Sequence, residues 1–148
     1  MFWFFARIFT GFVFAYAGFS KLMEPVENFR GILAQYEVIP YILTPFIAVT
    51  LPWIEFIFGA LFILGYATRL SALMLAGLSF CFLIVLGSSQ ILLGSTPISC
   101  GCFGEGVHLT VRQVFVLDIA DFVIALKLLS LPTHPFSLDH FLHSKTSR

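Results

Sequence analysis

Four long apolar stretches limit what this chain can fold into. They cover roughly residues 2–20, 45–66, 70–93 and 110–131. A helix needs about 20 apolar residues to cross a hydrocarbon core of about 30 Å. The stretches are apolar on every face, whereas the strands of a membrane β-barrel alternate apolar and polar residues. The pattern therefore predicts an all-α integral membrane protein, a bundle of four transmembrane helices.

Composition supports this class and excludes others. Only 11% of the 148 residues are charged and 59% are hydrophobic, whereas about a quarter of the residues in ordinary soluble domains are charged. A formal net charge of zero excludes the basic surface typical of nucleic-acid-binding proteins. The sequence contains no common nucleotide-binding motif and no HExxH zinc motif. We expect one membrane domain over residues 1–131, followed by a polar, disordered tail over residues 132–148.

Three connections join the four apolar stretches. The first has apolar residues at helical spacing and predicts a short amphipathic helix in the membrane interface, with a stripe of Val26, Phe29, Leu33 and Tyr36. The second, residues 66–69, has room only for a tight helical hairpin. The third, residues 94–109, is rich in glycine and contains two cysteines.

Basic residues predict the orientation, because cytoplasmic loops carry an excess of Lys and Arg. With four crossings, both termini share one side with the second connection. That side carries five basic residues, Arg7, Arg69, Lys127, Lys145 and Arg148, and the opposite side carries three, Lys21, Arg30 and Arg112. We therefore expect a multi-pass protein of the bacterial inner membrane with cytoplasmic termini and a periplasmic third connection.

The first apolar stretch also contains a match to a signal-peptidase site. Ala15-Tyr16-Ala17 fits the A-x-A pattern. No positive charge precedes the apolar run at residues 2–6, however, and cleavage would leave three crossings. We expect this stretch to be an uncleaved signal-anchor helix.

The third connection carries the sharpest chemical feature, Cys100-Gly101-Cys102. Residues i and i+2 lie close enough for a disulfide, but their side chains point apart unless the backbone makes an unusual turn. Gly101 supplies the backbone freedom that such a turn requires. Strained, exposed disulfides are the more oxidising and labile ones. The motif therefore favours a redox-active pair that exchanges electrons over a structural disulfide.

Two other interpretations of the cysteine pair stay open. A disulfide would simply lock the loop, or two thiolates would capture a soft ion such as Cu(I) or Hg(II). A zinc site is disfavoured, because only His108 lies nearby as a further ligand. Cys81 in the third apolar stretch is too far away to pair with either cysteine, and we interpret it as a small packing residue.

Four charged residues fall inside the apolar stretches: Arg7, Glu55, Asp118 and Asp121. A charged side chain at the bilayer centre costs at least about 2.5 kcal/mol, so each must face the bundle interior, find a partner or accept a proton. Asp118 and Asp121 are three residues apart and share a helix face. Two interpretations stay open. Arg7 pairs with Glu55 or an aspartate and fixes the helix packing, or the acids relay protons.

Taken together, these residues resemble the MauE/DoxX family of small four-helix membrane proteins over roughly residues 6–130. The resemblance rests on several separate matches: Arg7, Ala17-Gly18-Phe19-Ser20-Lys21-Leu22, Tyr36 with Ile39-Pro40, Leu51-Pro52-Trp53-Ile54-Glu55, Cys100-Gly101-Cys102-Phe103-Gly104, and Asp118.

The resemblance implies a redox-associated role. MauE-like proteins are linked to methylamine utilisation, where they accompany a thioredoxin-like periplasmic partner in maturing a disulfide-rich dehydrogenase subunit. By analogy, Cys100 and Cys102 are the catalytic pair of a thiol–disulfide oxidoreductase. The same analogy makes Gly101, Phe103 and Gly104 the residues that shape the loop, and it makes Arg7, Glu55 and Asp118, with Asp121 beside them, the polar membrane core.

Turnover of such a pair needs an electron carrier, and a membrane quinone is the candidate, although no motif marks its site. We assign no metal site to the chain. Two alternative functions remain at this level. One is a carrier of soft metal or of a small thiol compound, and the other is a non-catalytic membrane assembly subunit.

Overall fold

The computed structural model describes residues 1–34, 39–93 and 110–130. The described residues form five helices: α1 (Phe2–Met23), α2 (Val26–Leu33), α3 (Thr44–Leu64), α4 (Thr68–Leu93) and α5 (Val111–Ser130). The predicted cysteine-bearing connection and the predicted disordered tail lie outside these residues. The all-α prediction is confirmed for the part of the chain that the structure describes.

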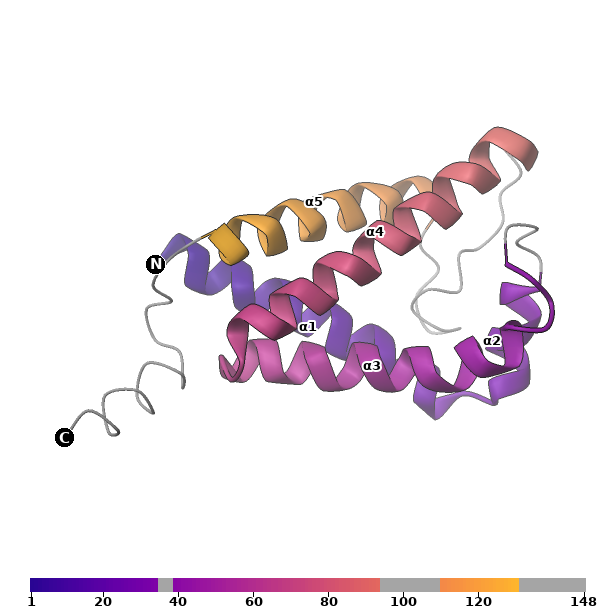
Figure 1. Cartoon of the computed structure of the whole chain (residues 1–148), viewed down its shortest axis with the longest axis horizontal. Coiled ribbons are helices and arrows are strands. Elements are labelled where there is room, and N and C mark those ends of the chain that lie inside the picture. The colour runs from indigo at the N-terminus through magenta and orange to yellow at the C-terminus, as the bar shows by residue number, and fades with distance from the viewer. Residues whose placement is uncertain (35–38, 94–109, 131–148) are drawn as a thin grey trace.

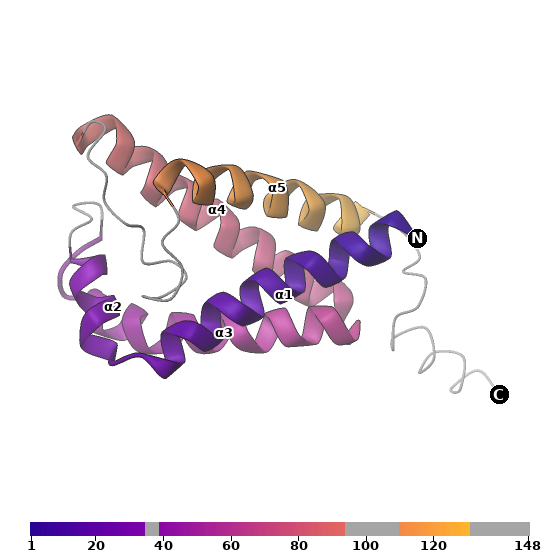
Figure 2. The same cartoon turned by 180° about the vertical axis from the view of Figure 1, so that it is seen from behind.

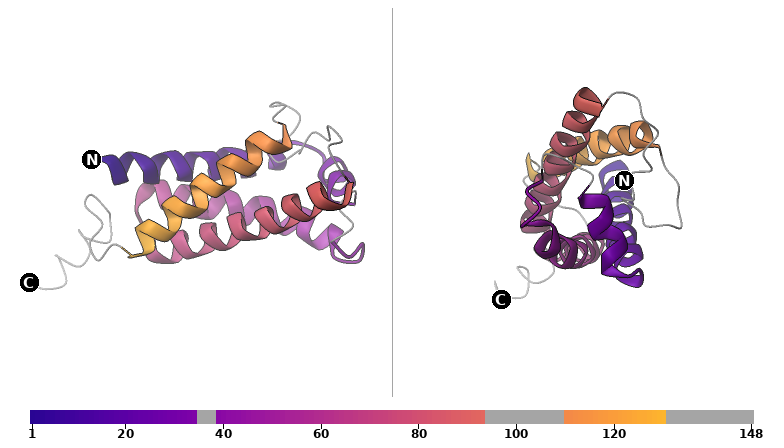
Figure 3. Two further views of the ribbon diagram at one scale, coloured as in Figure 1. Left: turned by 90° about the horizontal axis from the view of Figure 1, so that it is seen from above. Right: turned by 90° about the vertical axis from the view of Figure 1, so that its right-hand side faces the viewer.

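The four long helices form two antiparallel pairs, α1 with α3 and α4 with α5. The start of α1, the turn from α3 to α4 and the end of α5 lie at one end of the bundle, as Figures 1 and 2 show. The short helix α2 lies at the other end, the end towards which α4 runs. Figure 3 shows the long helices from above and from the end. All four contribute to one hydrophobic cluster, which contains Phe14, Phe62, Ala72, Leu75 and Leu128.

Among the described residues, three helices are long and apolar enough to cross a membrane: α1, α3 and the Thr68–Ser88 part of α4. The chain is therefore a multi-pass membrane protein. Helix α5 has 20 residues but carries four charged side chains, Arg112, Asp118, Asp121 and Lys127, and is not among the three. The predicted fourth span is thus not established by length and hydropathy, because these charges lower the apolar character of α5.

Helices α3 and α4 are joined by the tight hairpin that the short second connection predicts. Gly65 follows α3 in the left-handed backbone region, with φ of 69°, and its N–H donates to the carbonyl of Phe62. The N–H of Tyr66 reaches back to the carbonyl of Leu61. This arrangement satisfies carbonyls at the helix end, and glycine adopts the left-handed conformation without a steric penalty.

Helix α2 packs on the bundle through part of the predicted apolar stripe. Phe29 and Leu33 are buried and form a cluster with Ala48 of α3. Val26 remains 42% exposed. The fourth predicted residue of the stripe, Tyr36, lies outside the described residues. Helix α2 therefore covers one end of α3 with two of its side chains.

Helices α1 and α3 approach closely because small residues face each other. A Cβ atom built on Gly18 would lie 2.5 Å from the backbone nitrogen of Phe56, and one on Gly59 would lie 2.5 Å from that of Ala15. Small residues at helix interfaces allow this approach in membranes, where packing replaces the hydrophobic effect as the driving force. The pair α1–α3 is thus held at backbone contact distance.

We expect Gly59→Ala to weaken this pair, because the methyl group meets the backbone of α1 and not a side chain that can rotate away. Overpacking of this kind costs about 1–3 kcal/mol. Thermal unfolding in detergent, followed by circular dichroism, measures the loss. Gly77→Ala is the matched control, since a Cβ there meets nothing within 4 Å. Equal stability of the two variants would contradict the close approach.

Candidate functional site

The cysteine pair that the sequence singles out is not part of the described structure. Cys100 and Cys102, together with the loop-shaping residues Gly101, Phe103 and Gly104, fall in residues 94–109. Their redox role therefore stays a prediction. The described helices contain the other predicted site residues, and they reveal a charged site inside the bundle.

A buried ion pair links α1 to α3. The Lys21 ammonium donates to both carboxylate oxygens of Glu55, over 2.9 Å to Oε1 and 2.7 Å to Oε2. The two side chains are 2% and 0% exposed. A charge removed from solvent needs such a partner, because desolvation otherwise costs several kcal/mol. Both charges of the pair are therefore matched within the bundle.

The first apolar stretch was expected to end at residue 20, which leaves Lys21 in the connection that follows it. In the structure α1 extends through Met23, so Lys21 lies in the last turn of this helix, where a cation also interacts favourably with the helix dipole. Its ammonium lies 5.2 Å from the ring centroid of Phe29 and 5.5 Å from that of Phe82. These distances are within the range of cation–π contacts. The Lys21 ammonium thus has its carboxylate partner on α3 and one aromatic ring each on α2 and α4.

Of the two kinds of partner considered for Arg7, the pairing with Glu55 is wrong, whereas a pairing with an aspartate stays a prediction. Lys21 occupies both oxygens of Glu55, and Arg7 lies about 21 Å further along α1 at the helical rise of 1.5 Å per residue. The Arg7 side chain is nevertheless buried, and its guanidinium carbon lies 5.3 Å from the ring centroid of Phe4. Arg7 thus belongs to the opposite half of α1 from the ion pair.

A second polar contact links α1 to α5. The Thr10 hydroxyl donates to Oδ1 of Asp121 over 2.9 Å, and both residues are fully buried. One helical turn away on α5, Asp118 is 7% exposed. Within the described ranges, Oδ2 of each aspartate has no hydrogen-bond partner. The two aspartates therefore face into the bundle, and each has a carboxylate oxygen that can accept a further hydrogen bond.

Two cavities adjoin the ion pair. A small one of about 20 Å³ is lined by Lys21, Glu55 and Asp118 together with apolar neighbours. A cavity of this size has room for about one water molecule. The structure thus brings Asp118 to the same small space as the ion pair, which sequence spacing alone did not indicate.

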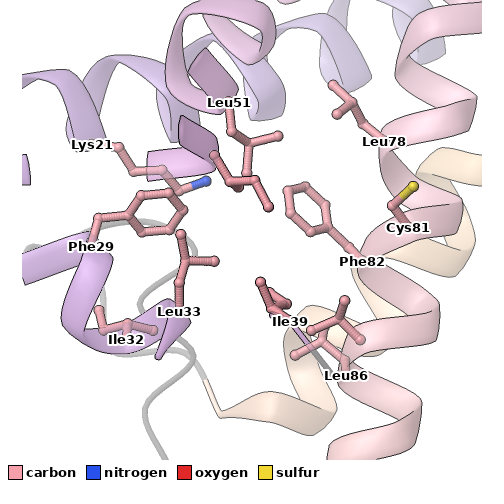
Figure 4. A pocket seen from close by; sticks show the side chains of 12 residues that line it. Lys21, Phe29, Ile32, Leu33, Ile39, Leu51, Leu78, Cys81, Phe82 and Leu86 are labelled. Atoms are coloured by element: carbon pink, nitrogen blue, oxygen red, sulfur yellow. The ribbon is translucent and has the colours of Figure 1, made fainter. Parts of the chain in front are cut away.

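The larger cavity has a volume of about 290 Å³ and is almost entirely apolar. Figure 4 shows its walls, which come from α2, α3, α4 and Ile39 between α2 and α3, with Lys21 of α1 at one edge. Phe82 and Lys21 line both cavities. Cys81 also lines the larger one and is exposed, so it is not the enclosed packing residue that the sequence predicts.

These observations define a class: a multi-pass helical membrane protein with an ion pair buried in its core. Within that class, the chain belongs to the MauE family, because the family model described as methylamine utilisation protein MauE matches residues 1–131. The methylamine utilization protein MauE of Paracoccus denitrificans is 32% identical to this chain over 111 residues, which cover 75% of this chain and 59% of that protein. No solved structure matches the chain. The family resemblance seen in the sequence is thereby confirmed, and the chain matches about three fifths of the length of this relative.

Lys21 is the site residue that residue-by-residue reasoning missed. It stands at the end of an apolar run, where a basic residue ordinarily marks the membrane surface. The available signal was the motif Ala17–Leu22, which carries Lys21 and contributed to the family resemblance. Glu55, buried in the next long helix, was recognised as needing a partner, but the cation considered for it was Arg7 and not Lys21.

Proposed function

We propose that this protein is a membrane thiol–disulfide redox protein that serves methylamine utilisation. It exchanges electrons through Cys100 and Cys102 with a thioredoxin-like periplasmic protein, and so supports disulfide formation in an extracytoplasmic protein. The observation that carries the proposal is membership of the MauE family combined with the Cys100-Gly101-Cys102 motif. The relative from Paracoccus denitrificans is itself named a methylamine utilization protein.

The exchange proceeds through a mixed disulfide. A thiolate of the partner attacks the Cys100–Cys102 disulfide, which forms a bond to one cysteine and releases the other as a thiolate. The second partner thiolate then attacks the mixed disulfide, so the partner leaves oxidised and the pair is left reduced. The same two steps in reverse oxidise the pair and reduce the partner.

We propose that α5 is the fourth span of the bundle. Its 20 residues correspond to about 30 Å of helix, which is enough to cross the hydrocarbon core. Its central charges, Asp118 and Asp121, are buried against the other helices and do not face outward. In this proposal four spans leave both termini on one side of the inner membrane. The excess of basic residues on that side favours the cytoplasm, and the cysteine pair then faces the periplasm, where disulfides persist.

The charged core fits a scaffold that holds the helices together, one contact within the α1–α3 pair and one between the two pairs. The Lys21–Glu55 ion pair joins α1 to α3, and the Thr10–Asp121 hydrogen bond joins α1 to α5. Buried polar contacts of this kind fix the register of neighbouring helices. In this proposal the helices position the cysteine loop, and the loop carries the chemistry.

Trapping tests the proposed exchange. In a Cys102→Ser variant, Cys100 has no neighbouring thiolate to resolve a mixed disulfide, and the Cys100→Ser variant reverses the roles. We expect one of these two variants to accumulate a covalent adduct with a thioredoxin-like protein. Mass spectrometry after purification identifies it, and a reductant releases it.

The double variant Cys100→Ser, Cys102→Ser is the matched control and forms no adduct. Absence of an adduct from both single variants would count against thiol exchange. If the same variants lose stoichiometric binding of Cu(I) or Hg(II), a soft-metal carrier replaces the redox function.

A further inference from the structure

The 290 Å³ cavity has the composition of a site for a lipophilic ligand. Its lining is apolar apart from Lys21, and it lies against a buried ion pair. Ligand sites are typically concave and apolar, with a few polar groups that fix the ligand's orientation, and their volumes begin at about 300 Å³. The volume suits one ring with a short substituent, whereas a whole lipid headgroup would not fit.

Lys21 has a donor to spare for such a ligand. Its ammonium carries three N–H groups, and the hydrogen bonds to Glu55 use two of them. In Figure 4 the Lys21 nitrogen lies beside the Phe29 ring, at the edge of the space that Leu33 and Phe82 also face. A ligand oxygen at this edge would therefore find an N–H donor next to two aromatic rings.

The charge of the site selects a neutral ligand. Glu55 already matches the charge of Lys21, and Asp118 lines the small cavity that adjoins the same ion pair. A carboxylate such as that of a fatty acid would add a like charge beside two acidic side chains, which is unfavourable in a medium of low dielectric constant. A carbonyl oxygen accepts the hydrogen bond without adding charge.

The position of Cys81 indicates how the ligand enters. Cys81 lines the cavity, is exposed, and lies midway along α4, which is one of the three candidate spans. The exposed side of a spanning helix at this depth faces hydrocarbon. The cavity is thus accessible from the lipid, which favours a ligand that is itself dissolved in the bilayer.

We infer that this cavity binds a lipophilic quinone, with one ring carbonyl accepting a hydrogen bond from Lys21 and the alkyl chain extending towards the lipid. The apolar cavity, the spare Lys21 donor and the exposure of Cys81 carry the inference together. Binding itself is independent of thiol chemistry. The redox use of the ligand rests on the proposed function: the two thiols of Cys100 and Cys102 give two electrons and two protons to the quinone, which leaves one disulfide and one quinol.

Photolabelling of the full chain in phosphatidylcholine nanodiscs tests the site. The probe is an azido derivative of decylubiquinone, and mass spectrometry locates the adducts. We expect labelling of α2 and α4 residues that line the cavity, and loss of that labelling when excess decylubiquinone competes. Decylbenzene, which has the chain and a ring but no carbonyl, should compete at least about tenfold more weakly, as expected for one hydrogen bond from a charged donor. Equal competition by decylbenzene would overturn the inference.

Two pairs of variants make the test specific. The double variant Lys21→Met, Glu55→Leu removes the donor without leaving an unpaired charge, and it should weaken probe binding at least about tenfold. Val85→Phe fills the cavity and should abolish labelling, whereas Ile84→Phe, at an exposed neighbouring position outside the lining, should retain it. Unchanged labelling in the double variant or in Val85→Phe would refute the site.

The same measurement in the Cys100→Ser, Cys102→Ser background separates this inference from the proposed function. Quinone labelling that persists there establishes the site whatever the role of the cysteines. Labelling that is absent in both backgrounds overturns the site, and it leaves the mixed-disulfide test unaffected.

Discussion

Lys21→Met is expected to destabilise the protein by about 3–5 kcal/mol, the cost of leaving one partner of a buried ion pair without the other. Methionine preserves most of the side-chain length, so the stability that is lost comes from the electrostatic interaction with Glu55. Glu55 then keeps a carboxylate that is fully buried and has lost the two hydrogen bonds from Lys21. Unfolding in a series of detergent mixtures with increasing dodecyl sulfate, followed by circular dichroism, measures the difference.

The double variant Lys21→Met, Glu55→Leu is the matched control for this result. Replacing both members of a buried ion pair with apolar residues of similar size is often neutral or stabilising, because neither charge has to be desolvated. We therefore expect the double variant to unfold close to the wild type. A double variant that is less stable than Lys21→Met would show that the ion pair does not act as a unit.

Replacing Cys100 and Cys102 with serine is expected to abolish growth on methylamine of cells that depend on this protein. Serine keeps the side-chain size but cannot form or attack a disulfide. Because the proposed exchange uses both sulfur atoms in succession, each single variant should lose as much as the double variant. Growth rate and the yield of mature methylamine-oxidising enzyme measure the loss.

Ser99→Ala provides the control, since it changes the neighbouring residue of the same segment without touching a thiol. It should grow as the wild type does, and immunoblots should show equal amounts of all variants in the membrane fraction. Normal growth of the double cysteine variant at normal abundance would exclude thiol chemistry. It would leave a non-catalytic assembly role as the function.

The long helices were predictable from sequence because their cause is local. An apolar run of about 20 residues has few alternatives to a membrane helix, and α1 and α3 begin and end within three residues of the runs that predict them. The membrane span of α5 was harder to predict, because Asp118 and Asp121 lower the hydropathy of this helix. Only its contacts with other helices show that these two residues are buried. Its span therefore remains a proposal.

The partners of the buried charges could not be predicted, because they depend on tertiary contacts. Lys21 and Glu55 are 34 positions apart, and nothing near Lys21 in the sequence distinguishes it from a basic residue at the membrane surface. The same holds for Thr10 and Asp121, which are 111 positions apart. The sequence did indicate that such charges need partners, since an isolated charge in hydrocarbon is costly.

The apolar cavity was not predictable at all. Its walls combine side chains from α2, α3 and α4, each of which appears in the sequence as an ordinary core or lipid-facing residue. Only the arrangement of these helices around Lys21 leaves a space between them. The cysteine pair is the reverse case. The sequence predicts a chemistry for it, and that chemistry stays a prediction because Cys100 and Cys102 lie outside the described structure.

The redox state of Cys100 and Cys102 in intact membranes tests the central claim most directly. Membranes are equilibrated with a graded series of dithiol and disulfide buffers, then treated with a membrane-impermeant maleimide from the periplasmic side. Mass spectrometry of the peptide that contains both cysteines reports the labelled fraction. We predict reversible titration at a potential well above that of structural disulfides, which lie below about −300 mV. A pair that resists all but strong reductants, or that the reagent labels only from the cytoplasmic side, would contradict the account.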